Sequence, residues 1–386
     1  MSTRTRLTPM LGMGAALAVF LCLSACRTTA GSAPAVDGDR EIAAILEPIL
    51  HSYRLPAMAA ALVTSRGVEA VGVVGVRKAG TDVAATAADL WHLGSDTKAM
   101  TAALVGTLVE RGALGWDTRV AEVFPELSPS FHSGFARLTI RELLCHRGGV
   151  PANLDWGRIS GTGTTAEQRV AAVKEALSQA PESPPGSRYL YSNLGYVIVG
   201  AVVERVTGKS WEEALAQEIF APLGMASAGQ GGTGTPGQID QPWGHLDGGE
   251  PVSANGPSMD NPPVLGPAGR VHASIGDWGA FVADVLRGAR GEKALLRAST
   301  YRTILTPPSG GDYALGWIVA EREWGGGKVL NHVGSNTMNL ANVWIAPRRD
   351  FALLVCINRG LDSFEASDRA MGELIRWWEG RSRGAH

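Results

Sequence analysis

The chain has 386 residues, of which 45% are hydrophobic and 19% charged, and its formal net charge is −2. This composition suffices for a packed apolar core and excludes a disordered chain or a coiled coil. Lysine and arginine are scattered rather than clustered, which argues against a nucleic-acid partner and favours a small-molecule or peptide ligand.

The N-terminus has the features of an export signal. Arg4 and Arg6 precede an apolar run over residues 10–23, which is too short to span a bilayer comfortably as a helix. We predict that residues 1–25 are a signal peptide. Residues 26–40 are mostly small, polar and turn-prone, as expected for a tether.

The segment Leu23-Ser24-Ala25-Cys26 resembles a bacterial lipobox. This resemblance implies a lipoprotein signal peptide, lipidation of Cys26 and an exported protein, facing the periplasm or on the cell surface. Contact with the membrane would then be through the lipid anchor only. A plain secretory signal, cut after a small residue, is the alternative, and it predicts export as well.

Hydrophobic periodicity outlines the domain over residues 41–386. An amphipathic helix is expected over residues 41–53, followed by β-like runs over 58–64 and 68–76 that Ser65-Arg66-Gly67 separates as a hairpin. Helical segments broken by glycine- and proline-rich loops occupy about residues 95–290. Strand-like runs return at 313–320, 328–332, 338–345 and 351–357, and a final helix is expected over 363–378.

Strands at both ends of the chain, with helices between them, indicate one architecture. We predict an α+β fold with three α/β/α layers, in which an antiparallel sheet is built from both chain ends and a helical region is inserted. Sequence says nothing about the oligomeric state.

The first candidate for catalysis is Ser95-Asp96-Thr97-Lys98, which runs into an apolar segment. On a helix, residues three apart share a face, so Lys98 would lie beside Ser95. A lysine whose pKa is lowered by burial can take the proton of a serine nucleophile. Ser-x-x-Lys alone is a weak signal, because an N-cap serine before a solvated lysine gives the same pattern.

Two further segments extend the pattern. In Tyr191-Ser192-Asn193, a phenol close to a lysine ammonium would lose its proton more easily and relay protons, and the asparagine amide would bind a substrate and orient the lysine. A buried tyrosine beside a turn asparagine is the ordinary alternative. In His332-Val333-Gly334-Ser335, a strand end could wall a cleft, and glycine would allow a ligand to approach.

The order Ser95-x-x-Lys98, Tyr191-x-Asn193 and His332-x-Gly334 resembles the serine β-lactamase and penicillin-binding-protein superfamily, and in particular its class C β-lactamase-related esterases and D-peptidases. The resemblance implies that Ser95 is the acylated nucleophile, Lys98 its activating amine and Tyr191 the general base and acid. Asn193 would bind the substrate amide, residues 332–334 would form the strand wall, and the N–H groups of Ser95 and Ser335 the oxyanion hole.

One departure from the family pattern bears on the substrate. Family β-lactamases usually have lysine where His332 stands, and histidine is a weaker anchor for a drug carboxylate. We therefore expect the protein to cleave an ester or a D-amino-acid-containing peptide amide in preference to hydrolysing a β-lactam. A noncatalytic protein that binds or senses cell-wall peptides or drugs is an alternative from another class.

Cofactors and cysteines add little to this interpretation. No histidine spacing suggests a metal site, so neither a metal nor another cofactor is expected. Cys145 and Cys356 could pair after export. A buried free thiol is the simpler interpretation of Cys356, which lies in an apolar run.

Overall fold

The computed structural model describes residues 37–161, 163–253 and 260–384. The chain divides into units of residues 1–34 and 35–386, and the fold described here is that of the second unit. The expected signal peptide, Cys26 and most of the expected tether lie outside the described residues.

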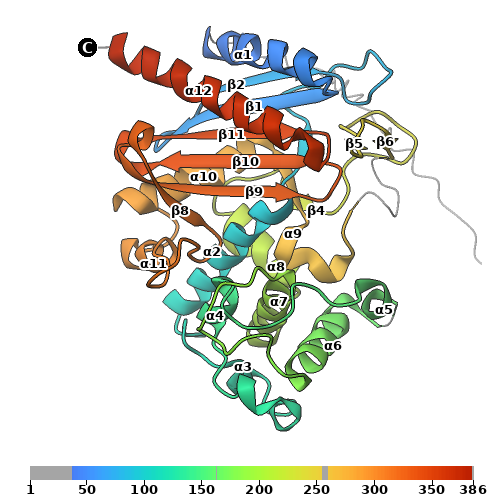
Figure 1. The fold of residues 1–386 in the computed structure, drawn as a ribbon, viewed down its shortest axis with the longest axis vertical. Helices are drawn as coiled ribbons and strands as arrows, with labels where there is room; N and C mark the ends of the chain where they lie inside the picture. Colours follow the sequence, from blue (N-terminus) through green and yellow to red (C-terminus); the bar gives the residue numbers. More distant parts are fainter. Residues whose placement is uncertain (1–36, 162, 254–259, 385–386) are drawn as a thin grey trace, which may run out of the picture. The chain divides into compact units, whose positions relative to one another are not determined.

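A six-stranded antiparallel sheet is built from both ends of this unit, as predicted (Figure 1). Its strand order is β2-β1-β11-β10-β9-β8. The strands are β1 (Ala57–Thr64), β2 (Gly67–Gly75), β8 (Ile318–Arg322), β9 (Gly327–Ser335), β10 (Leu340–Ala346) and β11 (Phe351–Ile357). The two ends meet where β1 pairs with β11, with Ala60 opposite Val355.

The sheet separates two apolar cores. Because successive strand side chains point to opposite faces, Ala59 and Ala61 belong to the larger core and Met58 and Ala60 to the smaller one. Helices α1 (Asp37–Tyr53) and α12 (Phe364–Gly384) cover the face of the smaller core. Helix α10 (Ile275–Arg290) and the inserted helical region cover the other face (Figure 1). The predicted three-layer architecture is confirmed.

The inserted region is mainly helical and surrounds a buried helix, α2. Its helices are α2 (Thr97–Glu110), α3 (Val120–Val123), α4 (Ile140–Leu144), α5 (Trp156–Ser160), α6 (Thr165–Ser178), α7 (Asn193–Thr207), α8 (Trp211–Leu215) and α9 (Gly266–Gly269), and α11 (Ala298–Ile304) follows α10. The first twelve residues of α2 are all buried. A helix that is apolar on all sides belongs in a core, and a lysine on it is withdrawn from water.

The starts of α1 and β8 are among the boundaries that differ from the sequence-based expectation. Helix α1 begins at Asp37, inside the expected tether, where the Asp39 carboxylate accepts a hydrogen bond of 2.8 Å from Val71 N and ties the first turn to β2. A strand was expected from residue 313, but β8 begins at Ile318. The chain turns back before it, since Tyr313 bridges to Ile318 and Gly316 has a φ of +81°.

A small second sheet lies beside the start of α2. Strand β7 (Val271–Ser274) is its centre, flanked by β3 (Leu90–His92) and β4 (Gly229–Gln230). A separate two-residue pair joins β5 (Gly244–His245) to β6 (Pro251–Val252). These strands are too short for hydrophobic periodicity to reveal, and the sequence analysis did not predict them.

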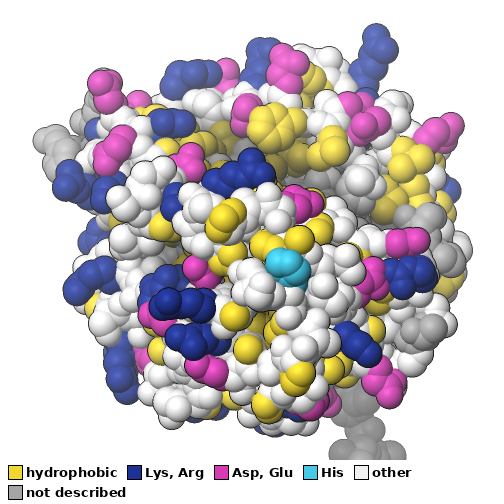
Figure 2. Space-filling view, turned by 60° about the horizontal axis from the view of Figure 1, so that its bottom comes forward, with side chains coloured by type: hydrophobic (Ala, Val, Ile, Leu, Met, Phe, Trp, Pro, Cys, Tyr) yellow, Lys and Arg dark blue, Asp and Glu magenta, His cyan; other side chains and the backbone are white. Residues whose placement is uncertain are grey.

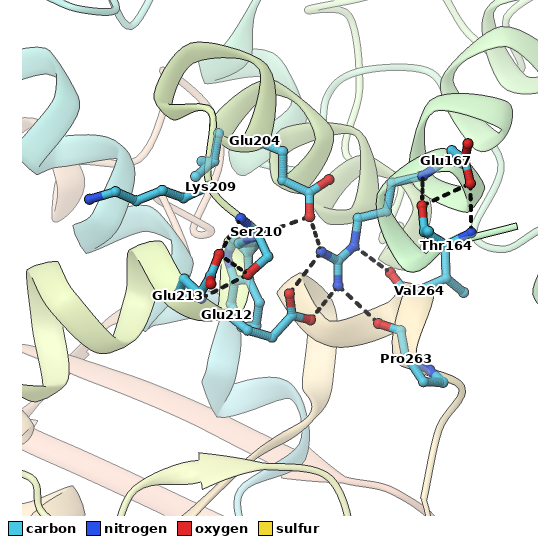
Figure 3. Close-up of polar contacts among 12 residues, drawn as sticks. Thr164, Glu167, Glu204, Lys209, Ser210, Glu212, Glu213, Pro263 and Val264 are labelled. Atoms are coloured by element: carbon cyan, nitrogen blue, oxygen red, sulfur yellow. Dashed lines mark hydrogen bonds and ion pairs between the residues drawn. The ribbon is translucent and has the colours of Figure 1, made fainter. Parts of the chain in front are cut away.

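Arg169 of α6 joins the helices of the inserted region from within. Its side chain is fully buried and forms ion pairs with Glu204 of α7 and Glu212 of α8. Its guanidinium also donates to the carbonyls of Pro263 at 2.9 Å and Val264 at 3.2 Å (Figure 3). A buried cation needs this many acceptors, because unpaired burial of charge is costly. The cluster thereby fixes the segment that leads into α9.

The surface charge and the helix lengths of the described residues can be compared with the partners expected from the sequence. On the face shown in Figure 2, Lys and Arg side chains are interspersed with Asp and Glu. Among the described residues, no helix combines the length and the apolar character needed to cross a bilayer. Cys145 and Cys356 are both buried free thiols, so the disulfide left open by the sequence does not form.

Candidate active site

Ser95 lies in a 3-10 turn, Gly94–Asp96, that leads directly into α2. Ser95 is partly exposed, whereas Gly94 and Asp96 on either side of it are buried. The serine hydroxyl is therefore the part of this turn that a substrate can reach. The sequence placed Ser95 at a helix start, and the structure places it two residues before Thr97, the first residue of α2.

Lys98 of α2 brings its amine to the serine. Its Nζ lies 3.0 Å from Ser95 Oγ, 2.8 Å from Asn193 Oδ1 and 2.7 Å from the carbonyl oxygen of Ala268. The side chain is completely buried. Burial lowers the pKa of Lys98 well below its ordinary value, and the nearby Asp96 carboxyl opposes that shift only in part.

These contacts fit a neutral lysine. An uncharged amine has two hydrogens, which the Asn193 amide oxygen and the Ala268 carbonyl accept, and one lone pair, which remains for the Ser95 hydroxyl. In this state the Ser95 hydroxyl can donate its proton to the lone pair. This arrangement prepares Lys98 to act as the base toward Ser95.

Tyr191 and Asn193 reach the site from the start of α7. Ser192 caps this helix, since its Oγ accepts from Gly195 N at 2.9 Å, and its own N–H donates to His146 Nδ1 at 3.1 Å. On either side of this cap, Tyr191 donates its hydroxyl to Ser95 Oγ at 2.8 Å and Asn193 turns its oxygen to Lys98. The expected grouping of Ser95, Lys98, Tyr191 and Asn193 is present in the structure.

The pKa of Tyr191 is shifted in the direction opposite to the one that a neighbouring ammonium would give. Burial raises the pKa of Tyr191 to about 12, the Ser95 hydrogen bond lowers it, and the Asp96 charge raises it further. The sequence argument invoked a neighbouring ammonium to lower this pKa. Burial also acts against the ammonium form of Lys98, and with a pKa of about 12 the Tyr191 phenol keeps its proton near neutral pH.

Strand β9 brings a backbone wall against the serine turn. An ideal Cβ added at Gly334 would lie 2.0 Å from Leu93 O and 2.6 Å from Ser95 N, and one at Gly94 would lie 2.2 Å from Ser335 N. Only glycine allows two backbones to come this close. The approach places Ser335 N near the Gly94–Ser95 turn, as an oxyanion hole made by Ser95 and Ser335 requires.

His332 is buried, with 3% of its surface exposed. Its Nε2 is 3.0 Å from the Tyr313 hydroxyl and its Nδ1 is 3.5 Å from Asp96 Oδ1. The sequence assigned His332 to the substrate wall, but in the structure its ring points into the protein. Burial raises the pKa of Asp96, while His332 and Lys98 act to lower it.

Several buried polar residues near the serine were not assigned a role by the sequence. They include Asp96 and His146, whose ring centroid is 4.3 Å from that of Tyr191. Burial lowers the pKa of His146 well below its ordinary value. The only available signal was the position of Asp96 beside Ser95, because the contacts of His146 depend on the fold.

The residues described in the structure include no group of three or more His, Cys, Asp or Glu side chains placed to hold a metal ion. The arrangement accounts for a nucleophile, a base and a proton donor with side chains alone. Such a site is suited to acyl transfer.

An antiparallel sheet with a helical insertion and a serine held between a buried amine and a phenol defines the class of serine acyl hydrolases. The Beta-lactamase family model matches residues 42–375, most of the chain, and the protein belongs to this family. Members of the superfamily are serine hydrolases that act on peptides or β-lactams.

Two curated relatives match a part of the chain. This chain is 36% identical over 154 residues to penicillin-binding protein 4 of Amycolatopsis lactamdurans, and the match covers 39% of each chain. It is 32% identical over 148 residues to a putative D-alanyl-D-alanine carboxypeptidase of Escherichia coli (strain K12), covering 37% of this chain and 34% of the relative. These matches thus span well under half of either relative.

A solved structure agrees over a longer stretch. The octameric penicillin-binding protein homologue from Pyrococcus abyssi superposes with a TM-score of 0.71, covering 88% of this chain and 77% of that chain at 21% identity. At this identity the likeness concerns the fold. The predicted resemblance to the β-lactamase and penicillin-binding-protein superfamily is confirmed by these comparisons.

Proposed function

We propose that this protein is a serine hydrolase that forms an acyl-enzyme on Ser95 and cleaves an ester or a D-amino-acid-containing peptide amide. The observation that carries the proposal is the contact of Ser95 Oγ with both Lys98 Nζ, at 3.0 Å, and the Tyr191 hydroxyl, at 2.8 Å. A hydroxyl between a neutral amine and a protonated phenol has a base on one side and an acid on the other.

The proposed reaction follows from these protonation states. Ser95 Oγ attacks the substrate carbonyl carbon while Lys98 Nζ takes the serine proton. The oxyanion is held by the N–H groups of Ser95 and Ser335, each worth about 2.7–4 kcal/mol of barrier by analogy with measured donors. Tyr191 donates its proton to the leaving group as the carbonyl–leaving-group bond breaks and recovers one from Lys98. Water then attacks the acyl carbon while Lys98 Nζ takes its proton, and this proton passes to Ser95 Oγ as the bond between Ser95 Oγ and the acyl carbon breaks and the acid is released.

The orientation of His332 supports the choice of substrate. Because its ring is buried against Tyr313 and Asp96, it does not offer a cation to a substrate carboxylate. A β-lactam drug and a peptide with a free C-terminus both carry such a carboxylate. We therefore rank esters and D-amino-acid amides without a carboxylate beside the reacting carbonyl above β-lactams.

The substrate proposal is tested with a matched panel. We expect the soluble domain, residues 27–386, to hydrolyse p-nitrophenyl acetate or a D-alanyl p-nitroanilide at least about tenfold faster, in kcat/KM, than benzylpenicillin, a difference of about 1.4 kcal/mol. Ser95→Ala measured in parallel supplies the background. Benzylpenicillin as the fastest substrate would reverse the ranking and make β-lactamase the better description.

We further propose that the protein is an exported lipoprotein with lipid on Cys26. The support is the lipobox-like sequence after an apolar run that follows two arginines. Expression of the full chain in a bacterium fed labelled palmitate is expected to label it, and Cys26→Ser is expected to abolish the label. Equal labelling of the variant would contradict lipidation at this residue.

A further inference from the structure

Behind the serine turn lies a buried histidine that the proposed reaction does not use. His92 is the last residue of β3 and is 4% exposed. Its Nδ1 accepts a hydrogen bond of 3.1 Å from the backbone N–H of Gly94. The ring is thus hydrogen-bonded to the Leu93–Gly94 peptide group, which lies one peptide group before the one that carries the Ser95 N–H.

The other side of the ring faces a buried carboxylate. Since Nδ1 accepts from Gly94, the hydrogen of the neutral ring is on Nε2, which lies 2.7 Å from Asp260 Oδ1. The Asp260 carboxylate also accepts hydrogen bonds from Arg270 Nε at 3.0 Å and from the Asn261 N–H at 2.7 Å. Burial acts to raise the pKa of Asp260, but His92 and Arg270 together lower it, so the carboxylate stays charged.

The turn that His92 contacts determines where the reacting atoms point. Gly94 has a φ of +50°, and its backbone is pressed against Gly334 and Ser335 of β9. A rotation of the Leu93–Gly94 peptide group would change the backbone of Gly94 and so move both the Ser95 N–H and the Ser95 hydroxyl. Misplacement by about 1 Å is enough to cost about 10²-fold in rate.

The segment that supplies Asp260 also contacts the other half of the catalytic pair. Eight residues after Asp260, the carbonyl of Ala268 accepts from Lys98 Nζ at 2.7 Å. Between these two contacts, Arg169 holds the carbonyls of Pro263 and Val264 (Figure 3). Residues 260–268 are thus held by Arg169 of the helical region. They contact Lys98 directly and the Ser95 turn through His92.

We propose that His92 and Asp260 form a positioning pair, which holds the Gly94–Ser95 turn in the orientation that the nucleophile needs. The inference rests on the proposed function of Ser95. His92 does not touch the substrate in this proposal, and it acts on the reaction through the Gly94 N–H.

The two nitrogens of His92 can be replaced separately. In His92→Asn the amide oxygen stands where Nδ1 was and can still accept from Gly94, whereas the contact with Asp260 is lost. In His92→Gln an amide group stands near Nε2 and can still face Asp260, whereas the acceptor for Gly94 is lost. The matched control is His272→Asn, because His272 is directly opposite His92 in the β3–β7 pair and has its Nδ1 on Gly231 O.

The measurement is the rate at which an alkyl fluorophosphonate labels Ser95, as a function of probe concentration, with the thermal midpoint of each variant. For His92→Gln we expect the limiting rate constant to fall about 10²-fold while the half-saturating concentration stays the same. His92→Asn should stay within about tenfold of the parent, and His272→Asn should match the parent rate.

A third variant tests the pairing itself. Asp260→Ala breaks the same contact as His92→Asn, so the double variant is expected to lose no more rate than the single ones. Three results would each overturn the pair. They are additive rate losses in the double variant, a His92→Gln variant that reacts at the parent rate, and rate losses in all variants that parallel their changes in thermal midpoint. A parent protein that is not labelled at Ser95 would overturn the proposed function, and the positioning pair with it.

Discussion

Replacement of Ser95 by alanine is expected to abolish covalent labelling and to lower kcat by about 10⁶-fold, the size of effect seen when a serine nucleophile is removed from a related mechanism. The reason is chemical, because Lys98 and Tyr191 both direct their polar atoms to Ser95 Oγ and without it no covalent intermediate forms. The check is the intact mass of the domain after exposure to a fluorophosphonate and, separately, to a penicillin, with the adduct mapped to a peptide.

The control for this experiment is Ser187→Ala. Ser187 is an exposed serine four residues before Tyr191, and its Oγ donates to Pro184 O. This variant should be labelled as the parent is. An adduct that survives in Ser95→Ala, or a parent that forms none, would refute the acyl-enzyme mechanism and favour the noncatalytic binding protein. The lifetime of a penicillin adduct separates hydrolysis from simple trapping.

Replacement of Lys98 by methionine is expected to slow the labelling of Ser95 by about 10²–10⁴-fold, the usual contribution of a general base. Because the lysine acts in its deprotonated form, the rate of the parent should rise with pH and level off above the pKa of Lys98. Burial lowers that pKa well below 10.5, so the plateau should be reached below pH 10.5. In Lys98→Met this rise should disappear.

Tyr191 limits the same profile on the alkaline side. Its pKa is raised to about 12, so loss of its proton should not reduce the rate within the rise assigned to Lys98. Lys174→Met is the matched control, since Lys174 is an exposed lysine of α6, and it should keep both the rate and the pH profile. A rise with pH that persists in Lys98→Met would assign the base to another group.

The burial of His332 changes how the family comparison is applied to this chain. The residue occupies the position where family β-lactamases usually have lysine, and in this structure it contacts Asp96 and Tyr313. Asp96 is itself the residue between Ser95 and Thr97. The contacts with Asp96 and Tyr313 explain why the His332 ring is withdrawn from the substrate side.

The sequence by itself determined the parts of the protein that depend on local order. The apolar runs of β1 and β11 and the helical spacing in α1 are short-range patterns, and burial of these apolar side chains gave the predicted sheet and its cover. The contact of Ser95 with Lys98 follows from a spacing of three residues. Local spacing could not set the start of β8, because a left-handed turn at Gly316 decides it.

Only the tertiary structure decided which distant residues meet and in which protonation state. Tyr191 reaches Ser95 across 96 positions of sequence, and Asp260 reaches His92 across a still longer separation without any spacing signal. The pKa of Lys98 and of Tyr191 depends on burial, which the sequence alone does not reveal. The order of motifs along the chain therefore predicted the family, whereas packing around α2 determined the contacts on which the proposed base, the proposed acid and the proposed positioning pair rest.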